Sequence, residues 1–329
     1  MNGTGAQDNQ VYRALKALAL RVPAIRRLVV QKVEAQRQLA LLDDPSMYAE
    51  LPGATEPRYA LLLDYPPSRE MRARWGYSRP PIPQLLTWFE SHAEDYRAFI
   101  ADMRGFGSEL RDVPYAFDPA QLPMPAWTGV ALNPIDGLAL YTFIRKHRPA
   151  TFLEIGSGTS TCFAHLARQR GNLSTRIVSI DPKPRAPIDA ICDHVVRSGL
   201  ETCDLSIFES LVAGDIIFMD GSHRCFMNSD VTVFFIDVLP MLKAGVIVQI
   251  HDIALPWDYH QSYAKWHWSE QYLLATYLMA SRERIDPLFP AAFVTAVPAF
   301  AKEFETPLVD QPFHLSWGGG GSMWFTHKS

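Results

Sequence analysis

The chain has 329 residues, enough for one large domain or two modest ones with a substantial core. Its 48% hydrophobic and 20% charged residues are typical of a soluble globular protein, and its net charge of −4 argues against a surface built mainly to bind nucleic acid. The four cysteines form no Cys-x-x-Cys pair, no signal peptide is apparent and no apolar run is long enough to span a bilayer, so a cytoplasmic protein with reduced thiols is expected.

Residues 1–42 are predicted to form a basic amphipathic helical segment. From Val11 to about Arg37, leucine, valine and isoleucine recur at helical spacing, with Pro23 as a point where the helix could bend. The other faces of this helix carry arginine and lysine. A helix of this kind packs on its own domain or on a partner, and a peripheral contact with an anionic membrane is the alternative.

Residues 43–135 are rich in proline and aromatic residues, and we predict a cap region that is irregular apart from one helix at Leu85–Met103. Irregular aromatic segments either cover the mouth of a binding site and contact its substrate, or wrap around the domain that carries the site. The sequence leaves both roles open.

Residues 136–329 alternate between helices and short apolar strands, which is typical of a doubly wound α/β domain with a mostly parallel sheet. Helices are expected at Leu138–Lys146, Asn228–Leu242 and Glu270–Ser281. Seven strands are expected, at Thr151–Ile155, Arg176–Ile180, His194–Val196, Asp215–Met219, Gly245–Ile250, Ala292–Val297 and Ser322–Thr326. The pattern leaves open whether the chain forms a homo-oligomer.

The first strand of this domain runs into a glycine-rich turn that begins the next helix. Gly156 and Gly158 allow a tight turn and the close approach of a ligand, and we expect Ser157 and Ser160 to contact that ligand as well. Asp181 ends the second strand, about 20 residues further on, where α/β proteins place an acid that accepts hydrogen bonds from a ribose. Together these residues predict a nucleoside-binding edge of the sheet.

Two features of the turn favour S-adenosylmethionine over NAD. The third glycine of the dinucleotide fingerprint is missing. Glu154 stands in the preceding strand, where it would repel a pyrophosphate but attract an amino group or a sulfonium. Leu153–Gly158 with Ser179–Asp181 resembles the first two motifs of class I S-adenosylmethionine-dependent methyltransferases, and the resemblance implies their Rossmann-like fold, in which the last strand runs antiparallel.

Two further predicted strands end in polar residues. One is followed by Asp220 and His223, and the other by His251 and Asp252. Because the carboxyl ends of parallel strands meet at one edge of a sheet, these four side chains should lie beside the cofactor, with Asp220 in contact with it. Asp and His also cap helices and bind loop amides, but four such groups at one edge favour a catalytic site.

The motifs Asp-Gly-Ser-His and Gly-Val-Ile-Val-Gln-Ile-His-Asp-Ile resemble those of metal-dependent sugar O-methyltransferases of macrolide and aminocoumarin biosynthesis, and of their cephalosporin-hydroxylase-like relatives. The resemblance implies that Asp220 and Asp252 bind Mg²⁺ and that His223 is the general base. His251 replaces an acid of that pattern, and imidazole suits Mn²⁺, Zn²⁺ or Fe²⁺ better than Mg²⁺. His251 is then a third metal ligand or an acid/base group, or no metal binds.

The resulting hypothesis is S-adenosylmethionine-dependent methyl transfer to a hydroxyl oxygen of a small or sugar-containing molecule. His223 would be the general base, and Asp220 and Asp252 would organise the acceptor or a divalent cation. Two alternatives stay open. One is a metal-dependent hydroxylase-like relative, and the other is a non-catalytic cofactor-binding scaffold in a membrane-associated assembly complex.

Overall fold

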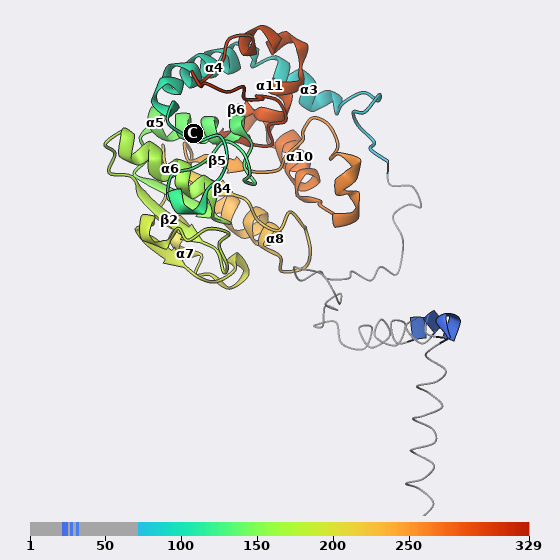
Figure 1. Ribbon diagram of the computed structural model, residues 1–329. Helices are drawn as coiled ribbons and strands as arrows, with labels where there is room; N and C mark the ends of the chain where they lie inside the picture. The colour runs from blue at the N-terminus through green and yellow to red at the C-terminus, as the bar shows by residue number, and fades with distance from the viewer. Residues whose placement is uncertain (1–21, 26, 29–30, 33–71, 329) are drawn as a thin grey trace, which may run out of the picture. The chain divides into compact units, whose positions relative to one another are not determined.

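The computed structural model describes residues 22–25, 27–28, 31–32 and 72–328 (Figure 1). The chain divides into two compact units, Met1–Glu70 and Met71–Ser329. In the first unit, residues 23–25, 27–28 and 31–32 are helical, and the rest of the helix predicted at Val11–Arg37 lies outside the described residues. Within the described part of the chain, no helix has both the length and the apolar character needed to cross a membrane.

The second unit is built on a seven-stranded sheet with the order β3-β2-β1-β4-β5-β7-β6. Strands β1 to β5 pair in parallel, and β7 runs antiparallel to both of its neighbours, β5 and β6. The strands are β1 (Thr151–Ile155), β2 (Arg176–Ile180), β3 (His194–Val196), β4 (Ile216–Met219), β5 (Ile247–Ile250), β6 (Ile285–Pro290) and β7 (Met323–His327). This confirms the predicted doubly wound, mostly parallel sheet of the Rossmann-like methyltransferase fold.

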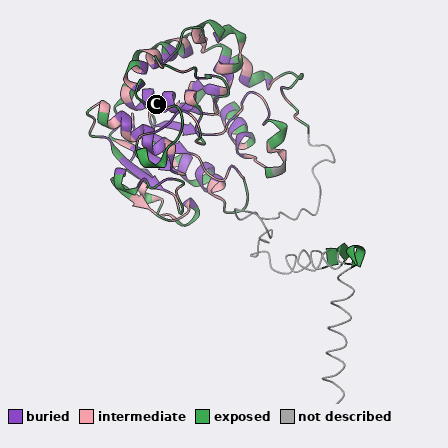
Figure 2. Ribbon diagram, viewed as in Figure 1, coloured by how far each residue is buried: buried purple, intermediate pink, exposed green. Residues whose placement is uncertain are grey.

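Helices flank this sheet, and its central strands are buried (Figure 2). The helices are α3 (Pro83–Glu90), α4 (Ala93–Gly107), α5 (Pro134–His147), α6 (Thr159–Arg170), α7 (Ser206–Glu209), α8 (Asp230–Val233), the π-helical η5 (Phe234–Val238), α9 (Leu239–Met241), α10 (Glu270–Ala280) and α11 (Ala291–Ala296). Short 3₁₀ turns are η1 (Ser108–Leu110), η2 (Pro119–Gln121), η3 (Asp189–Ile191), η4 (Leu200–Thr202), η6 (Gln261–Trp266), η7 (Arg282–Arg284) and η8 (Pro298–Phe304).

The central strands are buried on both faces, which explains why apolar and polar residues do not alternate along them. Every residue of β4 and β5 is buried, as expected where helices cover both faces of a parallel sheet. Phe143 of α5 stacks on Trp324 of β7 with ring centroids 4.0 Å apart. The ring centroid of Phe99 of α4 lies 4.3 Å from that of Phe143. Helix α4, from the predicted cap region, therefore packs in the same unit as the sheet. The three-part division at residues 42 and 135 stays a prediction.

One predicted strand is wrong. Ala292–Val297 is largely the helix α11, and the strand is the preceding segment β6. An apolar run of this length fits a buried helix as well as a buried strand. Two prolines, Pro287 and Pro290, hid β6 from the sequence analysis, and the structure places it at the edge of the sheet, where proline is tolerated.

The single helix predicted at Leu85–Met103 is two helices, α3 and α4. They are separated at Ser91 and His92, where the Ser91 hydroxyl donates a hydrogen bond to the carbonyl of Trp88 at 2.6 Å. Neither glycine nor proline marks this break, and the apolar residues keep their helical spacing across it. The sequence therefore predicted one continuous helix.

Candidate functional site

A glycine-rich turn joins β1 to α6 at the carboxyl end of the sheet. Gly156 has φ +80°, in the left-handed region that favours glycine, and a Cβ on it would lie 1.8 Å from the carbonyl oxygen of Asp220. The backbone N–H of Asp220 donates to the carbonyl of Ile155 at 2.8 Å. The turn and the end of β4 are thus held together by backbone contacts that leave no room for a side chain at position 156.

Asp181, at the end of β2, is bonded to the same turn. Its Oδ2 accepts the backbone N–H of Ser157 at 2.7 Å, and its Oδ1 accepts that of Lys183 at 2.7 Å. The Ser157 and Ser179 hydroxyls lie 2.7 Å apart. Since each carboxylate oxygen has two lone pairs, Asp181 can still accept hydrogen bonds from the hydroxyls of a ligand.

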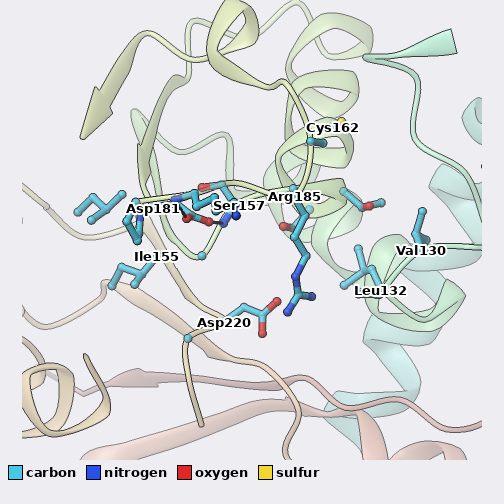
Figure 3. Close-up of a pocket in the computed structure, with 18 of the residues that line it drawn as sticks. Val130, Leu132, Ile155, Ser157, Cys162, Asp181, Arg185 and Asp220 are labelled. Carbon is cyan, nitrogen blue, oxygen red and sulfur yellow. Dashed lines mark hydrogen bonds between the residues drawn. The ribbon is translucent and has the colours of Figure 1, made fainter. Parts of the chain in front are cut away.

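A cavity of about 590 Å³ lies over the carboxyl ends of β1, β2 and β4 (Figure 3). Its wall includes all but one of the residues predicted to contact the cofactor, namely Gly156, Ser157, Gly158, Ser160, Asp181 and Asp220. The exception is Glu154. The structure therefore brings together, around one cavity, residues that are separated in sequence by about sixty positions.

Part of the predicted cap region forms another side of this cavity. The wall residues from this region are mostly apolar: Phe117, Leu122, Met124, Pro125, Gly129, Val130, Ala131 and Leu132. Of the two roles left open by the sequence, contact with the site is the one that this arrangement favours for residues 117–132. Sequence reasoning had not singled out any of these residues, because apolar side chains in an irregular segment carry no chemical signature.

Glu154 lies behind the turn rather than on the cavity wall. Its side chain is fully buried, its Oε2 accepts the hydroxyl hydrogen of Thr161, and Thr161 Oγ1 accepts the N–H of Gly158 at 3.1 Å. Burial raises the pKa of Glu154 to about 8, against the opposing effect of hydrogen bonds from nearby hydroxyls. At pH 7 this carboxyl is mostly neutral, so the repulsion of a pyrophosphate that the sequence suggested is weak, and Glu154 chiefly supports the turn.

The raised pKa of Glu154 predicts a pH-dependent stability. Because its pKa rises from 4.5 in the unfolded chain to about 8 in the folded protein, the free energy of unfolding should fall as the pH rises from 4.5 through 8. Glu154→Gln should flatten this fall, measured by urea denaturation at pH 5, 7 and 8.5. Glu90→Gln, at an exposed acid of α3, is the control and should leave the pH dependence unchanged. An equal pH dependence in wild type and Glu154→Gln would contradict the prediction.

A second group of side chains adjoins the cavity. Nε2 of His223 lies 3.4 Å from Oδ1 of Asp220 and 3.3 Å from Oδ2 of Asp252. One ligand atom from each of these residues lies within 4.8 Å of the other two. Asp220 belongs both to this cluster and to the cavity wall, so the cluster borders the predicted cofactor site.

His223 is held in an unusual conformation and in a charged environment. Its φ is +61° and that of Asp252 is +55°, values that few residues other than glycine adopt and that store backbone strain. Burial lowers the pKa of His223, but Glu270, Asp220 and Asp252 outweigh burial and raise it to about 9. The imidazole is therefore protonated at neutral pH in the absence of ligands, and it must lose this proton before it can act as a base.

Glu270, the first residue of α10, is a member of this cluster that the sequence analysis missed. Its fully buried Oε2 lies 3.0 Å from Nδ1 of His223, and the N–H groups of Ser269 and Glu270 donate to the carbonyl of His223 at 2.8 and 3.2 Å. Burial raises the pKa of Glu270, and the imidazole of His223 opposes this rise. An acid in the first turn of a helix is so common that its sequence position gave no signal of this contact.

His251 lies beside the cluster and is fully buried. Its Nε2 is 4.0 Å from Oδ1 of Asp252, and its Nδ1 is 3.2 Å from Nε2 of Gln249. Burial lowers the pKa of His251, but the carboxylates of Asp252, Asp220 and Asp136 outweigh it and raise the pKa. The structure thus groups His223, rather than His251, with Asp220 and Asp252 at metal-ligand spacing.

The donor set of the cluster fits a divalent cation. Asp220 and Asp252 offer carboxylate oxygens and His223 offers an imidazole nitrogen, and Asp220 also lines the cavity. Two oxygens and one nitrogen suit Mn²⁺, Fe²⁺ or Zn²⁺ better than Mg²⁺, which prefers oxygen ligands alone.

Comparison with known proteins gives a partial match. The sequence model of a methyltransferase domain matches residues 153–253. A comparison with curated proteins gave no match. Similar solved structures include the SAH-bound methyltransferase PaMTH1 of Podospora anserina, with 16% identity over 74% of this chain and 96% of that chain and a TM-score of 0.36.

Two further solved structures are similar to this chain, with comparable sequence identities and TM-scores. The O-methyltransferase from Bacillus cereus in complex with SAH has 18% identity over 70% of this chain and 100% of that chain, with a TM-score of 0.40. The plantazolicin methyltransferase BpumL in complex with SAH has 14% identity over 75% of this chain and 94% of that chain, with a TM-score of 0.37. Residues 153–253 thus match the sequence model of a methyltransferase domain, and the strand order of the sheet is that of the Rossmann-like methyltransferase fold.

Proposed function

We propose that this protein transfers a methyl group from S-adenosylmethionine to a hydroxyl oxygen of a small or sugar-containing molecule. The observation that carries the proposal is the position of Asp220. Its side chain lines the cavity beside the glycine-rich turn and Asp181, and it also lies 3.4 Å from Nε2 of His223. A cofactor held by the turn and Asp181 would therefore meet titratable groups on one side of the same cavity.

Methyl transfer from a sulfonium to oxygen is an in-line displacement, so most of its acceleration comes from holding the two reactants in line. Bound S-adenosylmethionine supplies a methyl group on a positively charged sulfur, which becomes a neutral thioether when the methyl group moves to oxygen. The turn and Asp181 hold the cofactor, and the apolar wall formed by residues 117–132 excludes water. Asp220 and Asp252 would orient the acceptor molecule by accepting hydrogen bonds from its other hydroxyl groups.

The acceptor must also lose its hydroxyl proton. Neutral His223 can take this proton on Nε2, because Glu270 faces Nδ1 and leaves Nε2 directed at Asp220 and Asp252. A divalent cation at Asp220, Asp252 and His223 would acidify the acceptor hydroxyl. Nε2 of His223 cannot bind a cation and accept a proton at the same time. The roles of His223 as a metal ligand and as the general base are therefore alternatives.

Titration calorimetry of the full chain with S-adenosylhomocysteine tests the proposal. Wild type should bind, and Asp181→Asn should bind roughly 10- to 100-fold more weakly, because charge-assisted hydrogen bonds to the ribose are lost. Asp189→Asn is the control, since Asp189 pairs with Arg197 at 2.5 Å and is not on the cavity wall. Failure of wild type to bind S-adenosylmethionine or S-adenosylhomocysteine at high micromolar concentration would rule out the proposal.

A metal-dependent hydroxylase-like function is the second candidate, favoured by the mixed nitrogen and oxygen donors of Asp220, His223 and Asp252. Metal analysis of the purified protein separates the two candidates. Bound iron supports the hydroxylase-like function, whereas Mg²⁺, Mn²⁺ or no bound metal supports methyl transfer.

A further inference from the structure

Arg185 lies next to the glycine-rich turn, although it is far from it in sequence. It follows β2, and its backbone N–H donates to the carbonyl of Ser157 at 3.4 Å. Its Cβ is 3.8 Å from the position that a Cβ on Gly158 would take. The loop after β2 therefore folds back onto the turn, which places the start of the Arg185 side chain at the edge of the cavity.

The guanidinium of Arg185 is free to meet a ligand. The side chain lines the cavity, and Figure 3 shows the guanidinium and the carboxylate of Asp220 both directed into it. Among residues 72–328 it forms no hydrogen bond or ion pair of its own. Other arginines of the same part of the fold are paired, Arg168 with Asp193 and Arg197 with Asp189, each at 2.6 Å or less.

A guanidinium without a partner on this wall needs an explanation, because the proposed cofactor carries a positively charged sulfur that a nearby guanidinium would repel. The same cofactor carries one negative group, the carboxylate at its amino-acid end. Glu154 is buried behind the turn and does not oppose a carboxylate there, since its raised pKa leaves it mostly neutral at pH 7. A guanidinium presents two parallel N–H groups that match the two oxygens of a carboxylate.

We propose that Arg185 binds the carboxylate of the amino-acid end of the cofactor and thereby directs the sulfonium toward Asp220. This inference rests on the proposed function. It makes Arg185 a determinant of cofactor specificity, selecting the complete amino-acid end over truncated adenosine thioethers. Asp181 and Arg185 would then hold two different groups of one ligand, its ribose and its carboxylate.

The test compares two ligands by titration calorimetry with the full chain. One is S-adenosylhomocysteine, and the other is S-adenosyl-3-thiopropylamine, which is the same molecule without its carboxylate. In wild type, loss of the carboxylate should weaken binding roughly 10- to 100-fold, the usual effect of a charge-assisted bidentate contact. In Arg185→Gln the two ligands should bind within about twofold of each other, at the affinity of the truncated ligand.

Two controls accompany this comparison. Arg185→Lys keeps the charge without the planar fork and should recover part of the selectivity. Lys183→Gln removes the other cation of the wall and should retain the selectivity of wild type. Equal weakening of both ligands by Arg185→Gln, or no effect on either, would overturn the role of Arg185 while leaving the proposed function intact. Failure of wild type to bind S-adenosylhomocysteine would instead overturn the proposed function, and with it this inference.

Discussion

Gly156→Ala is expected to lower the free energy of unfolding by about 4 kcal/mol and to abolish binding of S-adenosylhomocysteine. The left-handed backbone alone costs alanine about 1–2 kcal/mol. The larger cost arises because the new Cβ would lie 1.8 Å from the carbonyl oxygen of Asp220, so that β4 must move away from β1. Urea denaturation measures the first effect, and titration calorimetry measures the second.

Gly214→Ala separates the cost of the left-handed backbone from the cost of the overlap between the new Cβ and its neighbours. Gly214 has φ +89°, but no atom lies within 4 Å of the position that a Cβ would take there, so alanine meets the same backbone strain without the overlap. We expect a loss of about 1–2 kcal/mol and unchanged binding of S-adenosylhomocysteine. If both variants lost the same stability, the close approach of the turn to β4 would not be what excludes a side chain at position 156.

Glu270→Ala is expected to lower the free energy of unfolding by about 3–5 kcal/mol at pH 7, because it leaves the buried His223 imidazolium without its nearest carboxylate. The pH dependence of the free energy of unfolding should change as well. The pKa of His223 rises from 6.5 in the unfolded chain to about 9 in the folded protein, so its contribution to stability is complete below pH 6.5 and is lost as the pH rises through 9. In the variant the folded-state pKa of His223 is lower, so this loss should be smaller and should be complete at a lower pH.

Tyr272→Phe is the matched control for Glu270→Ala. It removes a different hydrogen bond of α10, from the Tyr272 hydroxyl to Oδ1 of Asp258 at 2.5 Å, and does not touch His223. Its free energy of unfolding should change by about 1 kcal/mol, with the pH dependence of wild type. The double variant His223→Ala/Glu270→Ala should be more stable than the sum of the single effects predicts, since no unpaired charge remains. Additive effects would contradict a direct pairing of these residues.

The grouping of the glycine-rich turn with Asp181 could be predicted because it depends on segments that are close in sequence. Gly156, Ser157 and Gly158 stand next to each other, and Asp181 ends the next strand, so the order of elements was enough to bring them together. The strands of the parallel sheet could also be predicted from the sequence, since buried strands are continuous apolar runs. Glu154 shows the limit of this reasoning. Its position in the strand was predicted, but its protonation depends on burial, which no single motif reveals.

The remaining parts of the site depend on contacts between distant segments. Glu270 reaches His223 across 47 positions, and Arg185 reaches Ser157 through a loop whose path has no sequence signature. The grouping of His223 with Asp220 and Asp252 depends on two residues in left-handed conformations, His223 and Asp252, which redirect side chains by an amount that strand order does not determine. His251, adjacent in sequence to Asp252, was considered as a metal ligand because it replaces an acid in the pattern of the family that the sequence resembles, and that pattern does not fix the direction of its side chain.

The cavity wall formed by residues 117–132 lies outside the segment 153–253 that matches the methyltransferase domain. The segment proposed to hold the cofactor and the segment that lines the rest of the cavity are therefore separate in the sequence. Exchange of residues 117–132 between two proteins with the same domain should alter which acceptor fits, while the cofactor affinity stays the same. Relatives grouped by the matched segment alone would accordingly share a cofactor without sharing an acceptor.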